Sequence, residues 1–138
     1  MEKQVQLAAL GVLLLITVRC KTPESNIDCR SVMCTMEFRM LNIVLKDKVG
    51  YFYKADKVET YDEAGKLIFS QNTPNHLPDT NYTVIDDGNL KDLKKNVDNA
   101  LEFKVYKGAL VVKTIKYVVT ADCCHVSKVK GDAEVLIE

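Results

Sequence analysis

The chain has 138 residues, which is enough for one ordinary domain but not for two. Lys and Arg together number 19, and so do Asp and Glu, so the formal net charge is zero. This balance argues against a nucleic-acid partner, because proteins that bind nucleic acid show a clustered cationic excess. Hydrophobic residues make up 47% and charged residues 28% of the chain, which is typical of a packed globular domain and not of a disordered one.

The N-terminal segment differs in composition from the rest of the chain. Residues 7–18, LAALGVLLLITV, form an uncharged apolar run. The run is short for a membrane-spanning helix, which needs about 17 to 25 residues, but it suits the apolar region of a secretory signal. A buried core helix is the alternative, although a small domain seldom buries a helix that is apolar on every side. We therefore expect residues 1–19 to be a signal peptide that directs export.

Cys20 follows this run, at the place where a bacterial lipoprotein signal carries the cysteine that becomes acylated. Such a signal usually has leucine three residues earlier and Gly or Ala directly before the cysteine. Here those positions hold Thr17 and Arg19, and the arginine counts against efficient processing. We predict a lipid anchor at Cys20, a polar tether over residues 20–33 and a location in the cell envelope, with free secretion as the alternative.

Five cysteines are many for a chain of this length. If Cys20 carries lipid, an even number remains, which suits disulfide bonds in an oxidising compartment. One of the three possible pairings needs a strained bridge between two neighbouring cysteines. We prefer a pairing that joins the start of the domain to its end, because closing a loop of about 90 residues stabilises by about 4 to 5 kcal/mol in the chain-entropy model. The disulfide candidates are Cys29, Cys34, Cys123 and Cys124.

From residue 34 onward, apolar residues recur mostly at every second position, as in β-strands. Within residues 36–45 the alternation changes phase near Met40, which predicts a bulge there. The turn DEAG, with Gly65, predicts a hairpin. The last two segments flank Gly131 and predict a second, closing hairpin. The predicted strands cover residues 36–45, 58–61, 66–70, 82–85, 101–106, 110–120, 125–129 and 133–137.

The remaining segments predict a loop and a helix. The loop covers residues 70–81, which contain two prolines and no apolar period. Residues 88–96 are the only plausible helix after the signal. We therefore expect a mainly β fold over residues 34–138: a single antiparallel β-sandwich of about seven strands with one short helix, preceded by the signal segment.

Two parts of the chain resemble a known class of proteins. The segment YVVTADCCHVSKVKGDAEVLI resembles the final strands of uncharacterised bacterial envelope lipoproteins with an immunoglobulin-like or transthyretin-like β-sandwich. KDKVG and the later VETYDEAGKLI are similar to the opening of carboxypeptidase-regulatory-like domains of that class. The resemblance spans residues 34–138 and implies a binding or spacer module without catalytic residues.

The densest polar cluster is DCCH, residues 122–125. Cys123 and His125 share a face of an extended chain and are candidates for a nucleophile and its base, but a disulfide beside an exposed histidine is the simpler interpretation. Soft sulfur with imidazole also suits Cu(I) or Zn(II), although the spacing matches no recognised motif. The ligands of this alternative metal site are Cys29, Cys34, Met36, Cys123, Cys124 and His125.

Other polar groups have structural explanations. Asp86, Asp87 and Asn89 fit a turn with an aspartate cap better than a calcium loop. Met36 lies at the same parity as Phe38 and alternates with the charged residues between them, which is typical of core residues. Four tyrosines offer a contact surface, although strand packing accounts for them equally well. They are Tyr51, Tyr53, Tyr61 and Tyr82.

These observations predict a non-enzymatic exported module that needs no cofactor. The predicted partners are the membrane, through the lipid anchor, and a protein, peptide or glycan ligand. The alternative is a periplasmic metal-binding or thiol-redox protein that uses the Cys/Met/His cluster.

Overall fold

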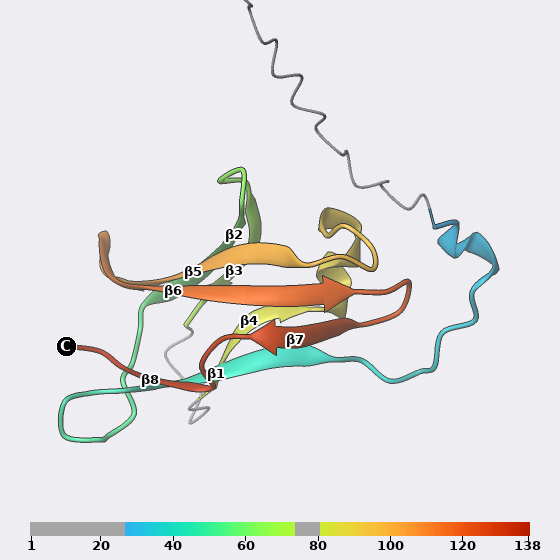
Figure 1. Cartoon of the computed structure of the whole chain (residues 1–138). Coiled ribbons are helices and arrows are strands. Elements are labelled where there is room, and N and C mark those ends of the chain that lie inside the picture. The colour runs from blue at the N-terminus through green and yellow to red at the C-terminus, as the bar shows by residue number, and fades with distance from the viewer. Residues whose placement is uncertain (1–26, 74–80) are drawn as a thin grey trace, which may run out of the picture.

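The computed structural model describes residues 27–73 and 81–138. Two β-sheets in this part of the chain pack around one apolar core (Figure 1). The strands are β1 (Met40–Lys46), β2 (Lys57–Asp62), β3 (Leu67–Asn72), β4 (Asn81–Asp86), β5 (Asn99–Lys107), β6 (Leu110–Ala121), β7 (Val126–Lys130) and β8 (Glu134–Leu136). The three-stranded sheet has the order β4-β1-β8, and the five-stranded sheet has the order β3-β2-β5-β6-β7. The prediction of a mainly β sandwich is therefore confirmed.

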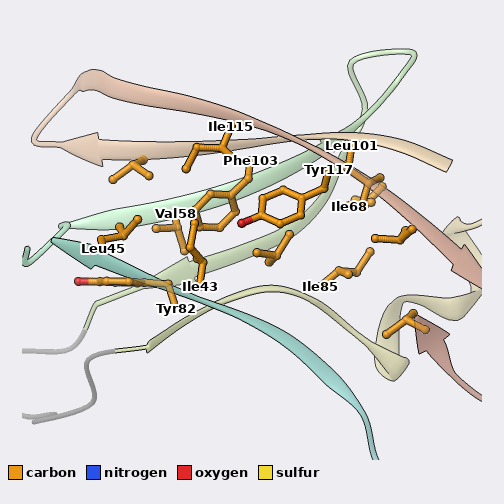
Figure 2. Packing of buried hydrophobic residues seen from close by; sticks show 14 of the residues in the cluster. Ile43, Leu45, Val58, Ile68, Tyr82, Ile85, Leu101, Phe103, Ile115 and Tyr117 are labelled. Carbon is orange, nitrogen blue, oxygen red and sulfur yellow. The ribbon is translucent and has the colours of Figure 1, made fainter. Parts of the chain in front are cut away.

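The core lies between the two sheets. Figure 2 shows Ile43 and Tyr82 of the three-stranded sheet facing Val58, Phe103 and Tyr117 of the five-stranded sheet. Phe103 and Tyr117 meet edge to face, with ring centroids 6.3 Å apart. Alternate residues of β5 are buried, which is the period of two that the sequence shows for this strand.

The hairpin predicted around DEAG is confirmed. β2 and β3 pair antiparallel, and Gly65 adopts a positive φ of 79° in the turn between them. The Asp62 side chain fixes the turn, because its Oδ1 accepts hydrogen bonds from the backbone N–H groups of Ala64 at 2.9 Å and Lys66 at 2.8 Å.

The closing hairpin predicted for the last two strands is wrong. β7 pairs antiparallel with β6, whereas β8 crosses to the other sheet and pairs parallel with β1. The crossing occurs at Gly131, whose φ of 136° is open to glycine and strained for other residues. The sandwich is therefore antiparallel except for the β1–β8 pair.

The predicted helix over residues 88–96 is shorter and of another type. The structure has a 3-10 helix, η2 (Asp87–Asp92), and the described residues also contain a shorter one, η1 (Cys29–Ser31). Asp86 caps η2 by accepting a hydrogen bond from the Gly88 N–H at 2.8 Å. Beyond it, Asn96 has a positive φ of 55°, which a helix cannot accommodate. No helix in the described part of the chain is long and apolar enough to span a bilayer.

The predicted start of the first strand, residue 36, lies four residues before the start of β1 in the structure. β1 starts at Met40, with a register shift between Leu41 and Asn42 close to the predicted bulge. Met36 and Phe38, which the alternation assigned to the core, are exposed. The reason is the length of the partner strand: Met40 pairs with Asp86, the last residue of β4, so residues before Met40 have no neighbouring strand to extend the ladder. Residues 27–39 instead form a segment outside the sheets, which we call the N-terminal arm.

Candidate functional site

Two disulfides tie the N-terminal arm to the connection between β6 and β7. Cys29 is bonded to Cys123, and Cys34 is bonded to Cys124; the Cα–Cα distance is 5.3 Å in each pair. All four candidate cysteines are paired, and the preferred connection of the start of the domain to its end is confirmed. Disulfides persist in oxidising compartments, so they support an exported location for this chain.

The structure does not assemble the alternative metal site. The four cysteine sulfurs are bonded to one another in two pairs, so they offer no thiolate, and Cys123 is no free nucleophile for His125. The Met36 side chain is exposed on the arm. Within residues 27–73 and 81–138, no group of three or more His, Cys, Asp or Glu side chains is placed to hold a metal ion.

The His125 side chain instead forms hydrogen bonds with both a threonine hydroxyl and an aspartate carboxylate. Its Nδ1 lies 2.8 Å from Oδ2 of Asp87, at the start of η2, and its Nε2 lies 3.1 Å from Oγ1 of Thr35, on the arm. The ionised Asp87 carboxylate can only accept, so Nδ1 of His125 donates this hydrogen bond, and the Thr35 hydroxyl can serve as donor or acceptor for Nε2. We call Thr35, His125 and Asp87 the polar clamp.

Backbone groups complete the polar clamp. The Asp87 carboxylate also accepts hydrogen bonds from the N–H of Arg39 at 2.8 Å and from the N–H of Val126 at 2.7 Å. Burial alone raises the pKa of a carboxyl group, but the hydrogen bonds from His125 and from these two N–H groups outweigh it and hold the pKa of Asp87 below its usual value. The arm, η2 and the start of β7 therefore meet at a single buried carboxylate.

Asp122 shapes the turn that carries His125. Its Oδ1 accepts hydrogen bonds from the N–H groups of Cys124 and His125, each at 2.7 Å. These backbone hydrogen bonds lower the pKa of Asp122. One short turn thus positions two disulfide cysteines and the clamp histidine.

The order of hydroxyl, imidazole and carboxylate is also the order that activates a nucleophile in hydrolases. In this chain, however, both groups that the arm contributes, the Thr35 hydroxyl and the Arg39 N–H, are bound to the His125–Asp87 pair. Thr35 lies one residue from the Cys34–Cys124 disulfide, which fixes the same part of the arm covalently. We therefore interpret these three side chains as the polar attachment of the arm to the sandwich.

The polar clamp is expected to stabilise the fold in a pH-dependent way. Because the pKa of Asp87 is lower in the folded chain, its contribution is complete above the unfolded-state pKa of about 4 and is lost as the pH falls through the folded-state pKa. Asp87→Asn should lower the free energy of unfolding at pH 7 by about 1 to 3 kcal/mol, the range for hydrogen bonds to a charged group. Urea unfolding at pH 7 and pH 3 measures this, and an equal loss at both values would contradict it.

A second feature is a hollow of about 480 Å³ beside the β2–β3 hairpin and the strands β5, β6 and β7. This volume lies within the usual range for sites that bind small molecules or short peptides. Acidic residues come from β2 and its turn and from β5, and basic residues come from β6 and β7, with Val118 adding apolar surface. The charged lining residues are Asp62, Glu63, Glu102, Lys116 and Lys130.

Next to the hollow, β2 and β5 carry a polar network on the face that points away from the core. Glu59 accepts a hydrogen bond from the Tyr61 hydroxyl at 2.6 Å and forms an ion pair with Lys57 at 2.8 Å. Burial alone would raise the pKa of Glu59, but hydrogen bonds from Lys57, Tyr61 and Tyr106 lower it to about 2. The Glu59 carboxylate thus has its hydrogen-bond and ion-pair partners on the surface of the same sheet.

The four predicted contact tyrosines do not form one surface. Tyr51 is exposed in the turn after β1, and Tyr61 is half-buried in the network on β2. Tyr82 is a core residue whose hydroxyl accepts a hydrogen bond from the Ala55 N–H at 2.8 Å and donates one to the Tyr53 carbonyl at 3.2 Å.

Sequence reasoning missed Thr35 and Asp87 as partners of His125. The turn pattern of residues 86–89 accounts for Asp87 locally, and no motif in the sequence includes Thr35. No local signal was available, because the contacts join residues 38 and 90 positions apart in the chain.

The fold and the bonded cysteines define the chain as a disulfide-linked β-sandwich domain. A scan against protein-family models gives no match, and neither a search of curated proteins nor a search of solved structures finds a similar one.

Proposed function

We propose that this chain is an exported, lipid-anchored module of the cell envelope that binds a peptide segment of a partner protein and catalyses no reaction. The apolar run of residues 7–18 followed by Cys20 supports the export and the anchor. The two disulfides support export, and membership of the immunoglobulin-like or transthyretin-like envelope lipoproteins is proposed on the sequence resemblance alone.

The observation that carries the binding proposal is the hollow with oppositely charged sides. Within residues 27–73 and 81–138, the ammonium groups of Lys116 and Lys130 make neither an ion pair nor a side-chain hydrogen bond. They stand on neighbouring strands, because Lys130 pairs with Val118, two residues along β6 from Lys116. Two unpaired ammonium groups beside the apolar Val118 side chain suit a ligand that has an acidic group next to an apolar group.

The opposite side of the hollow makes an extended peptide a better ligand than a glycan. Glu102 faces Lys116 across the β5–β6 pair, so a ligand with both charge signs finds a complement for each. Glycan sites use open aromatic faces, whereas Lys57 lies over the Tyr106 ring at 4.2 Å and Lys104 over the Tyr61 ring at 4.4 Å. The two rings next to the hollow are therefore already covered on one face.

Peptide binding is tested with a library of tetrapeptides that each contain one acidic and one basic residue. We expect NMR amide shifts confined to residues around the hollow, and Lys130→Glu should weaken binding by about tenfold, because a favourable ion pair of about 1.4 kcal/mol is lost. Lys48→Glu makes the same charge change at an exposed site in the turn after β1 and serves as the matched control. Equal affinities of the two variants would contradict the proposal.

The lipid anchor is tested separately. Intact-mass measurement of the chain extracted from membranes should show a mass that begins at Cys20 and includes acyl groups. Cys20→Ser should move the protein from the membrane to the soluble fraction, because the acyl groups can no longer be attached at residue 20. An unchanged membrane fraction for this variant would overturn the anchor and leave the peptide-binding proposal in place.

A further inference from the structure

The N-terminal arm presents apolar side chains to solvent. Met33 has a relative exposure of 95%, Met36 of 105% and Phe38 of 58%. They lie within six residues of one another on a segment that is held by two disulfides and by the polar clamp. Exposed apolar side chains gathered on a fixed segment mark a contact surface, whereas single ones scattered over a protein need no explanation.

The position of the arm in the chain indicates which surface covers it. The arm begins at Ile27, seven residues after the proposed lipid attachment at Cys20. Seven extended residues span at most about 25 Å, so the bilayer lies within reach of the arm. If the apolar run of residues 7–18 is retained instead, it brings the arm to the same membrane. In Figure 1 the arm leaves one end of β1, and the turn with Val49 and Tyr51 lies at the other end.

The charges on the arm are balanced. Asp28 lies 3.9 Å from Arg30, and Glu37 lies 3.1 Å from Arg39. A segment without net charge gains no attraction to anionic lipids, so its affinity for a bilayer comes from burial of apolar side chains. Apolar side chains that insert beside the acyl groups of the anchor add to the membrane affinity and restrict the orientation of the domain.

We propose that the N-terminal arm is a second membrane contact beside the anchor: Met33, Met36 and Phe38 insert into the interfacial layer of the membrane that holds the lipid anchor. The inference rests on the proposed anchoring. The arm then fixes the orientation of the sandwich, with the turn after β1 directed away from the membrane. The disulfides and the polar clamp keep the three side chains in place before insertion, so little conformational entropy is lost on binding.

The chain contains no tryptophan, which allows a direct test. Met36→Trp, purified from membranes with its acyl groups and reconstituted into phosphatidylcholine vesicles, should shift its emission to shorter wavelength and be quenched by lipids brominated on their acyl chains. Val49→Trp is the matched control, because Val49 is also exposed, at 76%, but lies at the opposite end of β1. It should show neither change. Met36→Trp emission that is the same in vesicles and in detergent-free buffer would overturn the inference.

A second measurement separates the arm from the anchor. The mature Cys20→Ser chain retains the arm without the acyl groups, and its binding to phosphatidylcholine vesicles should fall about tenfold when Met33 and Met36 are both changed to Asp, since about 1.4 kcal/mol or more of apolar burial is lost. High salt should leave this binding unchanged. No difference between the two chains would overturn the arm's role, while an acylated mass of the wild-type chain would still support the anchor.

Discussion

Removal of both disulfides is expected to lower the free energy of unfolding by about 7 kcal/mol, and removal of either one by only about 2 to 3 kcal/mol. The two loops overlap almost completely, since Cys29 and Cys123 are 94 residues apart, Cys34 and Cys124 are 90 residues apart, and the two bonds interleave along the chain. Whichever bond remains still closes the long loop. The bond that is removed therefore contributes only the stabilisation from closing the small ring of residues 29–34 and 123–124.

The comparison uses three variants in urea unfolding experiments. One replaces Cys34 and Cys124 by Ser, one replaces Cys29 and Cys123, and one replaces all four. Domains of this size are stable by about 5 to 15 kcal/mol, so the variant with all four changes should be largely unfolded or close to it at 37 °C. Single-pair losses that add up to the loss in the quadruple variant would contradict this account of two overlapping loops.

Gly131→Ala is expected to destabilise the fold by about 3 kcal/mol, through backbone strain and overpacking together. A Cβ at this position would lie 2.1 Å from Cδ1 of Tyr117, and the residue has a φ of 136°. The ring cannot move away easily, because Tyr117 is buried against Phe103 and its hydroxyl donates a hydrogen bond to the Asp132 carbonyl at 2.6 Å.

Gly108→Ala is the control for this substitution. Gly108 also has a positive φ, 58°, but a Cβ there would meet no atom within 4 Å. It should cost about 1 kcal/mol, the effect of backbone conformation alone. Equal losses for the two variants in thermal or urea unfolding would show that the Tyr117 contact contributes nothing.

Local patterns in the sequence determined much of this architecture. The alternation of apolar residues located most strands, and the turn DEAG marked the β2–β3 hairpin, because a strand period and a turn depend on residues a few positions apart. The even set of cysteines after Cys20 also indicated that the start of the domain is joined to its end. Both long-range pairings satisfied that condition, and only the fold selects Cys29 with Cys123.

Other features depended on which segments the fold brings together. Met36 has the alternation of a core residue, yet it is exposed because β4 ends opposite Met40 and offers it no partner. The last strand joins β1 instead of closing a hairpin, because the passage at Gly131 against Tyr117 leads the chain to the other sheet.

The five cysteines, unusually many for the chain, thus proved to be the most informative part of the sequence. Their number and position favoured a link between the start of the domain and its end, and this preference needed only their chemistry and spacing. The polar clamp was decided by the tertiary structure alone. Thr35, Asp87 and His125 come from three separate segments, and a hydrogen bond needs atoms about 3 Å apart, which no pattern within one segment specifies.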